Sequence, residues 1–76
     1  MINIQDIIPF MKKGWVAMDK DGEWWWYNKK PVKSKSLLQW LSDCDNVVYY
    51  CIDKAFDIAP ADDWTKSLIQ VKGDKQ

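Results

Sequence analysis

The clearest pattern of apolar and polar positions spans residues 15–28, WVAMDKDGEWWWYN. Two apolar runs flank an Asp-Gly pair, which is a preferred two-residue hairpin turn because both of its positions need positive φ. This turn would place Met18 opposite Trp25, whereas a four-residue turn with a bulge at Gly22 would shift the pairing by one position. The segment therefore predicts a β-hairpin, with its register open between these two turns.

Large apolar side chains occupy both faces of this predicted hairpin. Because side chains alternate along a strand, Trp24 and Trp26 share one face, and Trp25 and Tyr27 share the other. A chain of 76 residues offers few elements with which to cover both faces. We expect one tryptophan face to form the core, as a small chain requires for stability, and the other to form an interface.

Two short helices are also expected. Residues 4–11 place apolar side chains at helical spacing behind Asn3, which can cap the helix, and Pro9 predicts either a kink or a helix that begins near Pro9. Ser36 can cap a second helix over residues 37–43, LLQWLSD. Both helices would present apolar side chains to the hairpin.

Further apolar runs follow in the second half of the chain. Residues 46–52, NVVYYCI, are β-branched and aromatic, which is typical of a well-buried strand, and the strand region extends to residue 58. The two acids after Pro60 are typical of a one-turn helix start, and residues 65–71 fit either helix or strand.

Together these elements predict one compact α+β domain over residues 1–71, with residues 72–76 as a frayed C-terminal tail. Its small antiparallel β-sheet would combine the aromatic hairpin with the 46–58 strand region. One or two short helices would pack on that sheet.

The charged residues limit the class of partner. Acidic and basic side chains balance at eleven each, every basic one is Lys, and ten of the acids are Asp. Without Arg the chain lacks the guanidinium group, which binds guanine or phosphate through two parallel hydrogen bonds. A chain with no net charge also binds polyanions poorly. These features argue against strong nucleic-acid binding.

Composition also argues against catalysis and metal binding. The chain has no histidine, which is the most frequent general acid–base residue and the usual activator of a thiol nucleophile. Cys44 and Cys51 do not form a CxxC pair, so no zinc site is expected, and their pairing in a disulfide stays open. We expect no enzyme activity, no catalytic residue, no cofactor and no metal.

The candidate binding surface, for a protein or a ligand, is the aromatic run and the two lysines that follow it. Its residues are Trp24, Trp25, Trp26, Tyr27, Lys29 and Lys30. We expect Trp24, Trp26 and Tyr27 to make the contact, because Trp and Tyr dominate interface hot spots. Trp25 is the alternative if the register turns its face outward, and the lysines would form a polar rim.

Two stretches carry a resemblance to known proteins. GWVAMDKDGEWWWYNKKP and FDIAPADDWTKSLIQV resemble small accessory proteins of unassigned function encoded by phages and prophages, which share an aromatic hairpin and an I-x-P-x-x-D-W-x-x-S-L ending. The likeness covers both ends of the chain. A weaker resemblance, on Gly14, Trp15, Asp63 and Trp64, is to phage anti-defence proteins that sequester nucleotide signals.

We therefore expect a non-enzymatic protein–protein interaction module, a phage or prophage accessory protein that binds a host protein, a phage protein or a second copy of itself. No apolar run reaches membrane-spanning length and the N-terminus has no signal-peptide pattern, so we expect a cytoplasmic protein, in the host cytoplasm if phage-encoded, with no membrane partner. The first alternative is a small-ligand binder that stacks a nucleotide base or sugar ring on Trp and meets phosphate with Lys. The second alternative is weak single-stranded nucleic-acid binding.

Overall fold

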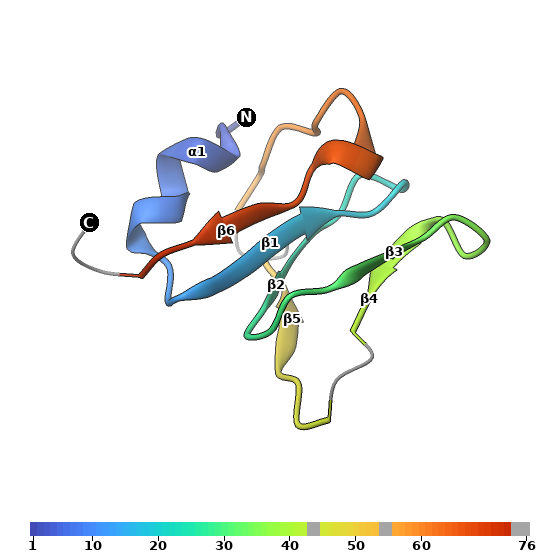
Figure 1. Cartoon of the computed structure of the whole chain (residues 1–76). Helices are drawn as coiled ribbons and strands as arrows, with labels where there is room; N and C mark the ends of the chain where they lie inside the picture. Colours follow the sequence, from blue (N-terminus) through green and yellow to red (C-terminus); the bar gives the residue numbers. More distant parts are fainter. Residues whose placement is uncertain (43–44, 54–55, 74–76) are drawn as a thin grey trace.

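The computed structural model describes residues 1–42, 45–53 and 56–73. The chain forms a small α+β domain with antiparallel sheets, as the sequence predicts at this level (Figure 1). Its elements are α1 (Ile4–Ile7), the 3₁₀ turn η1 (Ile8–Phe10), β1 (Gly14–Met18), β2 (Trp24–Tyr27), β3 (Val32–Ser34), β4 (Gln39–Leu41), β5 (Tyr49–Cys51), the 3₁₀ turn η2 (Trp64–Lys66) and β6 (Ile69–Val71). None of the helices described is long and apolar enough to cross a membrane.

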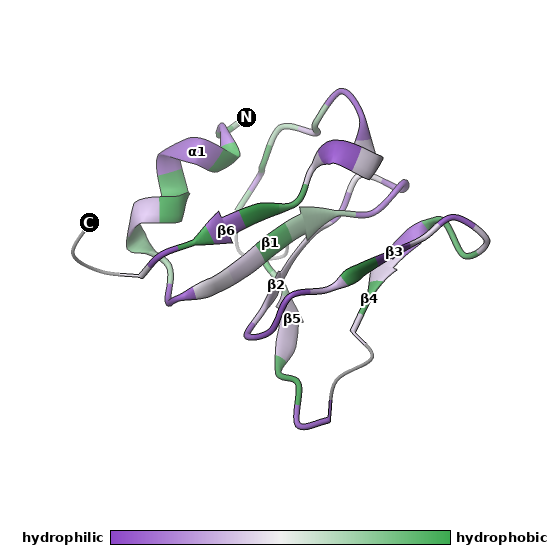
Figure 2. Cartoon of the chain, viewed as in Figure 1, coloured by the Kyte–Doolittle hydropathy of each residue, from purple (hydrophilic) through white to green (hydrophobic). Residues whose placement is uncertain are grey.

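Four strands form the main sheet in the order β5-β2-β1-β6, and each neighbouring pair is antiparallel. β3 and β4 form a separate two-stranded sheet, which lies beside the main sheet (Figure 1). Hydrophobic stretches lie on α1, β1, β6 and the β3–β4 hairpin, whereas the turns that follow β1 and β2 are hydrophilic (Figure 2). The main sheet is therefore the frame on which the rest of the chain packs.

The predicted β1–β2 hairpin forms, with the bulged turn in place of the two-residue turn. Met18 pairs with Trp24, and Gly22 has a φ of 93°. The Gly22 N–H donates to the Asp19 carbonyl at 2.9 Å, and the Asp19 N–H donates to the Glu23 carbonyl at 3.0 Å. Because Gly tolerates the left-handed conformation, the turn closes with one residue more than the Asp-Gly pair alone would use.

One face of the main sheet packs on the N-terminal helix and on the loop that follows β5. Its buried side chains are Ile4, Val16, Met18, Trp24, Trp26, Ile52, Ile58 and Val71. The Asn3 side chain caps α1 by accepting the Gln5 N–H at 2.9 Å. Pro9 lies in the first turn of η1, where the missing N–H is tolerated, so the predicted kink is a change from α-helix to 3₁₀ turn.

The other face is covered as well, by the β3–β4 hairpin and η2. Its buried side chains are Ala17, Tyr27 and Trp40. The Trp40 ring meets the Trp64 ring edge-on, with centroids 6.4 Å apart, and its Nε1 donates to the Trp64 carbonyl at 3.2 Å. The expectation that the chain is too short to cover both faces of the hairpin is therefore wrong.

The predicted helix over residues 37–43 is also wrong over residues 37–42, and residue 43 lies outside the described residues. Residues 39–41 are instead β4, and Leu38 has a φ of 58° in the turn before it. A helix of seven residues has little stability of its own. In the strand, the Trp40 side chain is buried, and the main-chain N–H of Trp40 donates to the Asp19 carboxylate at 2.8 Å. Tertiary packing therefore outweighs the helical spacing of the leucines.

The predicted strand within residues 46–52 is β5, but it lies at the edge of the sheet and is not well buried. Tyr49 and Tyr50 are 56% and 47% exposed. Of the described residues that follow, Ile58 pairs in an isolated parallel bridge with Ile2 and does not extend β5. A run of β-branched and aromatic residues predicts a strand without indicating how many neighbours that strand has.

The C-terminal segment, whose sequence fits either helix or strand, contains both: the helical turn η2 is followed by the strand β6. Asp63 caps η2 by accepting the Thr65 N–H at 3.0 Å. Between them, the buried Ser67 hydroxyl accepts the Met18 N–H at 2.8 Å and so continues the β1–β6 ladder with a side chain. Residues 74–76 of the predicted tail lie outside the described residues.

Candidate functional site along the β5 edge

The outer edge of β5 has main-chain groups that no described strand pairs. The Ile52 N–H donates to the Trp24 carbonyl at 3.0 Å, so the main-chain groups of Ile52, and of Tyr50 two residues before it, face β2. Because the N–H and C=O groups of successive residues point to opposite sides of a strand, Tyr49 and Cys51 point theirs away from β2. This edge can therefore accept another strand.

The side chains of β5 flank this edge on both faces of the sheet. The Tyr50 ring stacks on Trp26, with centroids 5.0 Å apart and 24° between the planes. On the opposite face, the Tyr49 ring lies 5.9 Å from Trp25 and 6.1 Å from Tyr27, measured between centroids. Aromatic contacts of this kind hold both tyrosines in place while leaving about half of each exposed.

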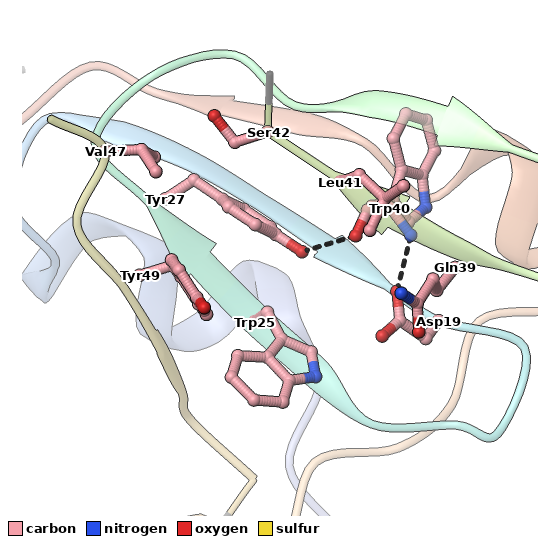
Figure 3. A pocket seen from close by; sticks show the side chains of 9 residues that line it. All are labelled: Asp19, Trp25, Tyr27, Gln39, Trp40, Leu41, Ser42, Val47 and Tyr49. Carbon is pink, nitrogen blue, oxygen red and sulfur yellow. Dashed lines mark hydrogen bonds between the residues drawn. The ribbon is translucent and has the colours of Figure 1, made fainter. Parts of the chain in front are cut away.

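A pocket of about 280 Å³ lies on the Tyr49 face, between β2, β4 and β5 (Figure 3). We name it the Asp19 pocket, and its lining includes Asp19, Trp25, Tyr27, Gln39, Leu41 and Tyr49. In Figure 3, Trp25 lies between Asp19 at one end and Tyr49 at the other. The pocket therefore combines aromatic walls with a single carboxylate at its end.

The carboxylate of Asp19 is the charged group of this pocket. Burial raises the pKa of Asp19, the Trp40 N–H lowers it, and repulsion from Asp21 and Glu23 raises it further. The described residues that line the pocket include no lysine or arginine beside this carboxylate.

The other polar groups of the pocket are neutral. The Tyr27 hydroxyl donates to the Trp40 carbonyl at 3.3 Å, and burial raises the pKa of Tyr27. The Trp25 Nε1 is buried and finds no acceptor in the structure described. None of the lining residues that the structure describes is positively charged, so Asp19 sets the electrostatic preference of this described lining.

A second pocket, of about 420 Å³, lies beside β5 on the Tyr50 face. We name it the Phe10 pocket, and its lining includes Ile7, Phe10, Met11, Tyr50, Ile52 and Phe56. Phe10 is 87% exposed, although a large apolar side chain gains from burial. The Phe10 pocket is therefore an apolar surface next to an unpaired strand edge.

The structure places the predicted surface residues in three environments. Trp24, Trp26 and Tyr27 are 1%, 5% and 4% exposed, so they are core and do not form an exposed contact surface, although Tyr27 also lines the Asp19 pocket. The Trp24 and Trp26 indoles also donate to main-chain carbonyls at 3.1 Å, which uses their polar groups internally. The physical reason is that both faces of the β1–β2 hairpin are covered.

The remaining three predicted residues are more accessible. Trp25 is half-buried and lines the Asp19 pocket. Lys29 and Lys30 are exposed, and Lys30 Nζ lies 5.5 Å from the centroid of the Trp15 ring. This is a cation–π contact near the start of β1, so Lys30 belongs to a different surface from the β5 edge.

Sequence reasoning missed the residues of the β5 edge and, apart from Trp25 and Tyr27, the residues that line the two pockets beside it. The sequence predicts a well-buried strand around Tyr49 and Tyr50, and it gives no sign that Asp19 lies beside a pocket. Phe10 offered a signal, because it falls outside the helical spacing of residues 4–11 and is nevertheless large and apolar. Cys51 carries a free thiol, and Cys44 lies outside the described residues.

Within the described residues, no three His, Cys, Asp or Glu side chains come together as a metal site. In comparisons with protein-family models, with curated proteins and with solved structures, none matches this chain. The functional argument therefore rests on the geometry of the β5 edge and of the two pockets beside it.

Proposed function

We propose that this protein is a non-enzymatic interaction module that binds an extended segment of a partner protein as an additional strand beside β5. The observation that supports this proposal is the unpaired outer edge of β5, at Tyr49 and Cys51, next to the apolar Phe10 pocket. Strand addition at a sheet edge obtains affinity from main-chain hydrogen bonds and specificity from pockets for alternate side chains.

The two faces of β5 suggest the composition of the partner segment. Side chains of an added strand alternate between the faces, so every second one would lie beside Tyr50 and the Phe10 pocket. We expect apolar residues at those positions, because the pocket presents Phe10, Met11 and Phe56. The intervening positions would lie beside Tyr49, which is exposed and can make aromatic or polar contacts.

The partner could be a host protein, a phage protein or a second copy of this chain. The resemblance to phage and prophage accessory proteins is the basis for the first two, and it remains a prediction. A second copy would pair its own β5 edge with this one. Sedimentation over a concentration series distinguishes this case, because a dimer made through β5 would dissociate on dilution and would be lost in an edge-blocked variant.

A proline substitution tests the proposal directly. Cys51→Pro removes an outward-facing N–H and places the proline ring at the edge, without removing a hydrogen bond to β2. Cys51→Ala is the matched control, because it removes the thiol and keeps the N–H. Heptapeptides selected on the wild-type protein from a random library serve as ligands.

We expect Cys51→Pro to weaken these peptides at least about tenfold in fluorescence anisotropy, the equivalent of one or two lost hydrogen bonds. Cys51→Ala should bind like the wild-type protein, and thermal unfolding should show both variants folded. Equal binding by the folded Cys51→Pro variant would exclude strand addition at β5.

A further inference from the structure

We infer that the Asp19 pocket binds an alkylammonium group, with the carbon chain on the rings of Trp25 and Tyr27 and the ammonium at the carboxylate of Asp19. The inference goes beyond the proposed function, because it concerns the interior of a pocket and a small cation, and does not depend on the β5 edge. It rests on three properties of the pocket, which are its walls, its charge and the hydrogen-bonding state of Asp19.

The walls suit the carbon chain of such a ligand. Trp25, Tyr27 and Tyr49 present aromatic surface along the pocket, and Leu41 adds an aliphatic side chain. Aromatic rings attract cations through their quadrupole and also shield an alkyl chain from water. A ligand with an apolar stem and a positive head therefore matches the walls better than a fully polar one.

The charge of the pocket selects the sign of the ligand. Asp19 is partly buried, and Asp21 and Glu23 lie near enough to repel its charge. An incoming cation would relieve this repulsion, whereas a phosphate or carboxylate would add to it. The alternative of a nucleotide whose phosphate meets lysines is disfavoured here, because the described lining of this pocket contains no lysine.

The hydrogen bond at Asp19 discriminates between two kinds of cation. One of its oxygens, Oδ1, already accepts the Trp40 N–H at 2.8 Å. A guanidinium binds best when both oxygens of a carboxylate accept its two parallel N–H groups, so it would have to share Oδ1 with the Trp40 N–H, whereas an ammonium needs only one oxygen. The site therefore fits an ammonium head, as in a primary amine or a lysine side chain.

Titration with n-butylammonium, followed in the ¹H–¹⁵N spectrum of the full chain, tests this inference. The Trp25 indole signal, assigned with Trp25→Phe, reports on the pocket. 1-Pentanol is the neutral probe of similar size. Asp19→Asn removes the charge and can still accept the Trp40 N–H, whereas Asp62→Asn removes an exposed charge from another segment.

We expect a saturable shift of the Trp25 signal with n-butylammonium, and no saturable shift with 1-pentanol. Asp19→Asn should weaken binding about tenfold, as expected for a lost charge-assisted hydrogen bond, and Asp62→Asn should leave it unchanged. The inference is overturned if n-butylammonium gives no saturable shift, if 1-pentanol gives an equal one, or if Asp19→Asn binds equally well. Peptide binding at β5 is measured separately, so failure of the ammonium site leaves that proposal standing, and failure of strand addition leaves this one.

Discussion

The Asp19 carboxylate accepts the Trp40 N–H at 2.8 Å, and this bond joins the end of β1 to β4. A second link runs in parallel, because the Lys20 N–H donates to the Leu38 carbonyl at 3.2 Å. The turn of the first hairpin is therefore anchored to the second hairpin, and the Asp19 pocket exists because of this attachment.

Substitutions at Asp19 should separate its hydrogen bond from its charge. Asp19→Ala leaves the Trp40 N–H without its acceptor and should lower the free energy of unfolding by about 1–2 kcal/mol. Asp19→Asn keeps an acceptor and removes a charge that burial disfavours, so it should be at least as stable as the wild-type protein at pH 7. Urea unfolding measures both, and equal destabilisation by the two variants would mean that the charge, and not the bond, stabilises this junction.

Matched Trp→Phe substitutions should distinguish two neighbours in β2. Trp24 is fully buried and its Nε1 donates to the Ala59 carbonyl at 3.1 Å, so Trp24→Phe should cost about 1–3 kcal/mol of unfolding free energy. Trp25 is half-buried and its Nε1 has no acceptor within the described structure. Trp25→Phe removes that unsatisfied donor and should change the free energy by less than about 0.5 kcal/mol. A larger loss of unfolding free energy for Trp25→Phe than for Trp24→Phe would contradict the assignment of the core face.

Gly14 allows the close approach of β1 and the Trp26 ring. A Cβ at this position would meet the Tyr27 carbonyl and the Trp26 ring inside ordinary contact distance. Gly14→Ala should therefore lower the free energy of unfolding by about 1–3 kcal/mol through overpacking. Gly22→Ala is the comparison, because that Cβ meets nothing within 4 Å and the loss comes only from its φ of 93°. Trp26→Leu puts a smaller side chain beside Gly14. In this Trp26→Leu variant, adding Gly14→Ala should lower the free energy of unfolding by less than it does in the wild-type protein, whereas the loss caused by Gly22→Ala should not change.

Asp53 should make stability depend on pH. Its Oδ2 accepts the Trp24 N–H at 3.1 Å, while its Oδ1 is buried and has no partner in the described structure. Burial raises the pKa of Asp53 above its ordinary value of 3.8, against the lowering effect of the Trp24 N–H. The folded protein therefore holds this proton more tightly than the unfolded chain does.

The sign of the effect follows from linkage. Stability contributed by the protonated form is present below the unfolded pKa and is lost as pH rises through the folded pKa. The free energy of unfolding of the wild-type protein, minus that of Asp53→Asn, should therefore fall as pH rises from about 3.8 upward. Urea unfolding of both proteins across this range measures the difference, and a difference that rises with pH would show that Asp53 is stabilised as the charged form.

The β1–β2 hairpin and the Asn3 cap could be predicted because their signals are local. An Asp-Gly pair between apolar runs and a capping residue before helical spacing depend only on near neighbours in the sequence. The register of the hairpin depends on whether Gly22 adopts a bulge. That choice is coupled to Asp21, whose side chain accepts the Glu23 N–H at 3.0 Å.

The β3–β4 hairpin and the exposure of β5 could not be predicted, because both depend on distant parts of the chain. The apolar spacing around Trp40 fits a helix, and only the contact with Trp64 and the bond to Asp19 favour a strand. Likewise, the amino-acid sequence of β5 does not show that this strand lies at the edge of the main sheet, next to β2 among the described strands. The burial of Trp24 and Trp26 could not be predicted for the same reason, since their coverage is decided by α1 and the loop after β5.

Amide hydrogen exchange at β5, with and without a selected peptide, tests the central proposal most directly. In the free protein, the Tyr50 N–H faces β2 and should exchange slowly, whereas the Tyr49 and Cys51 N–H groups face solvent and should exchange fast. We predict that a bound peptide slows exchange at Tyr49 and Cys51 and leaves Tyr50 nearly unchanged. A peptide that binds without slowing exchange at these two amides would contradict strand addition at β5.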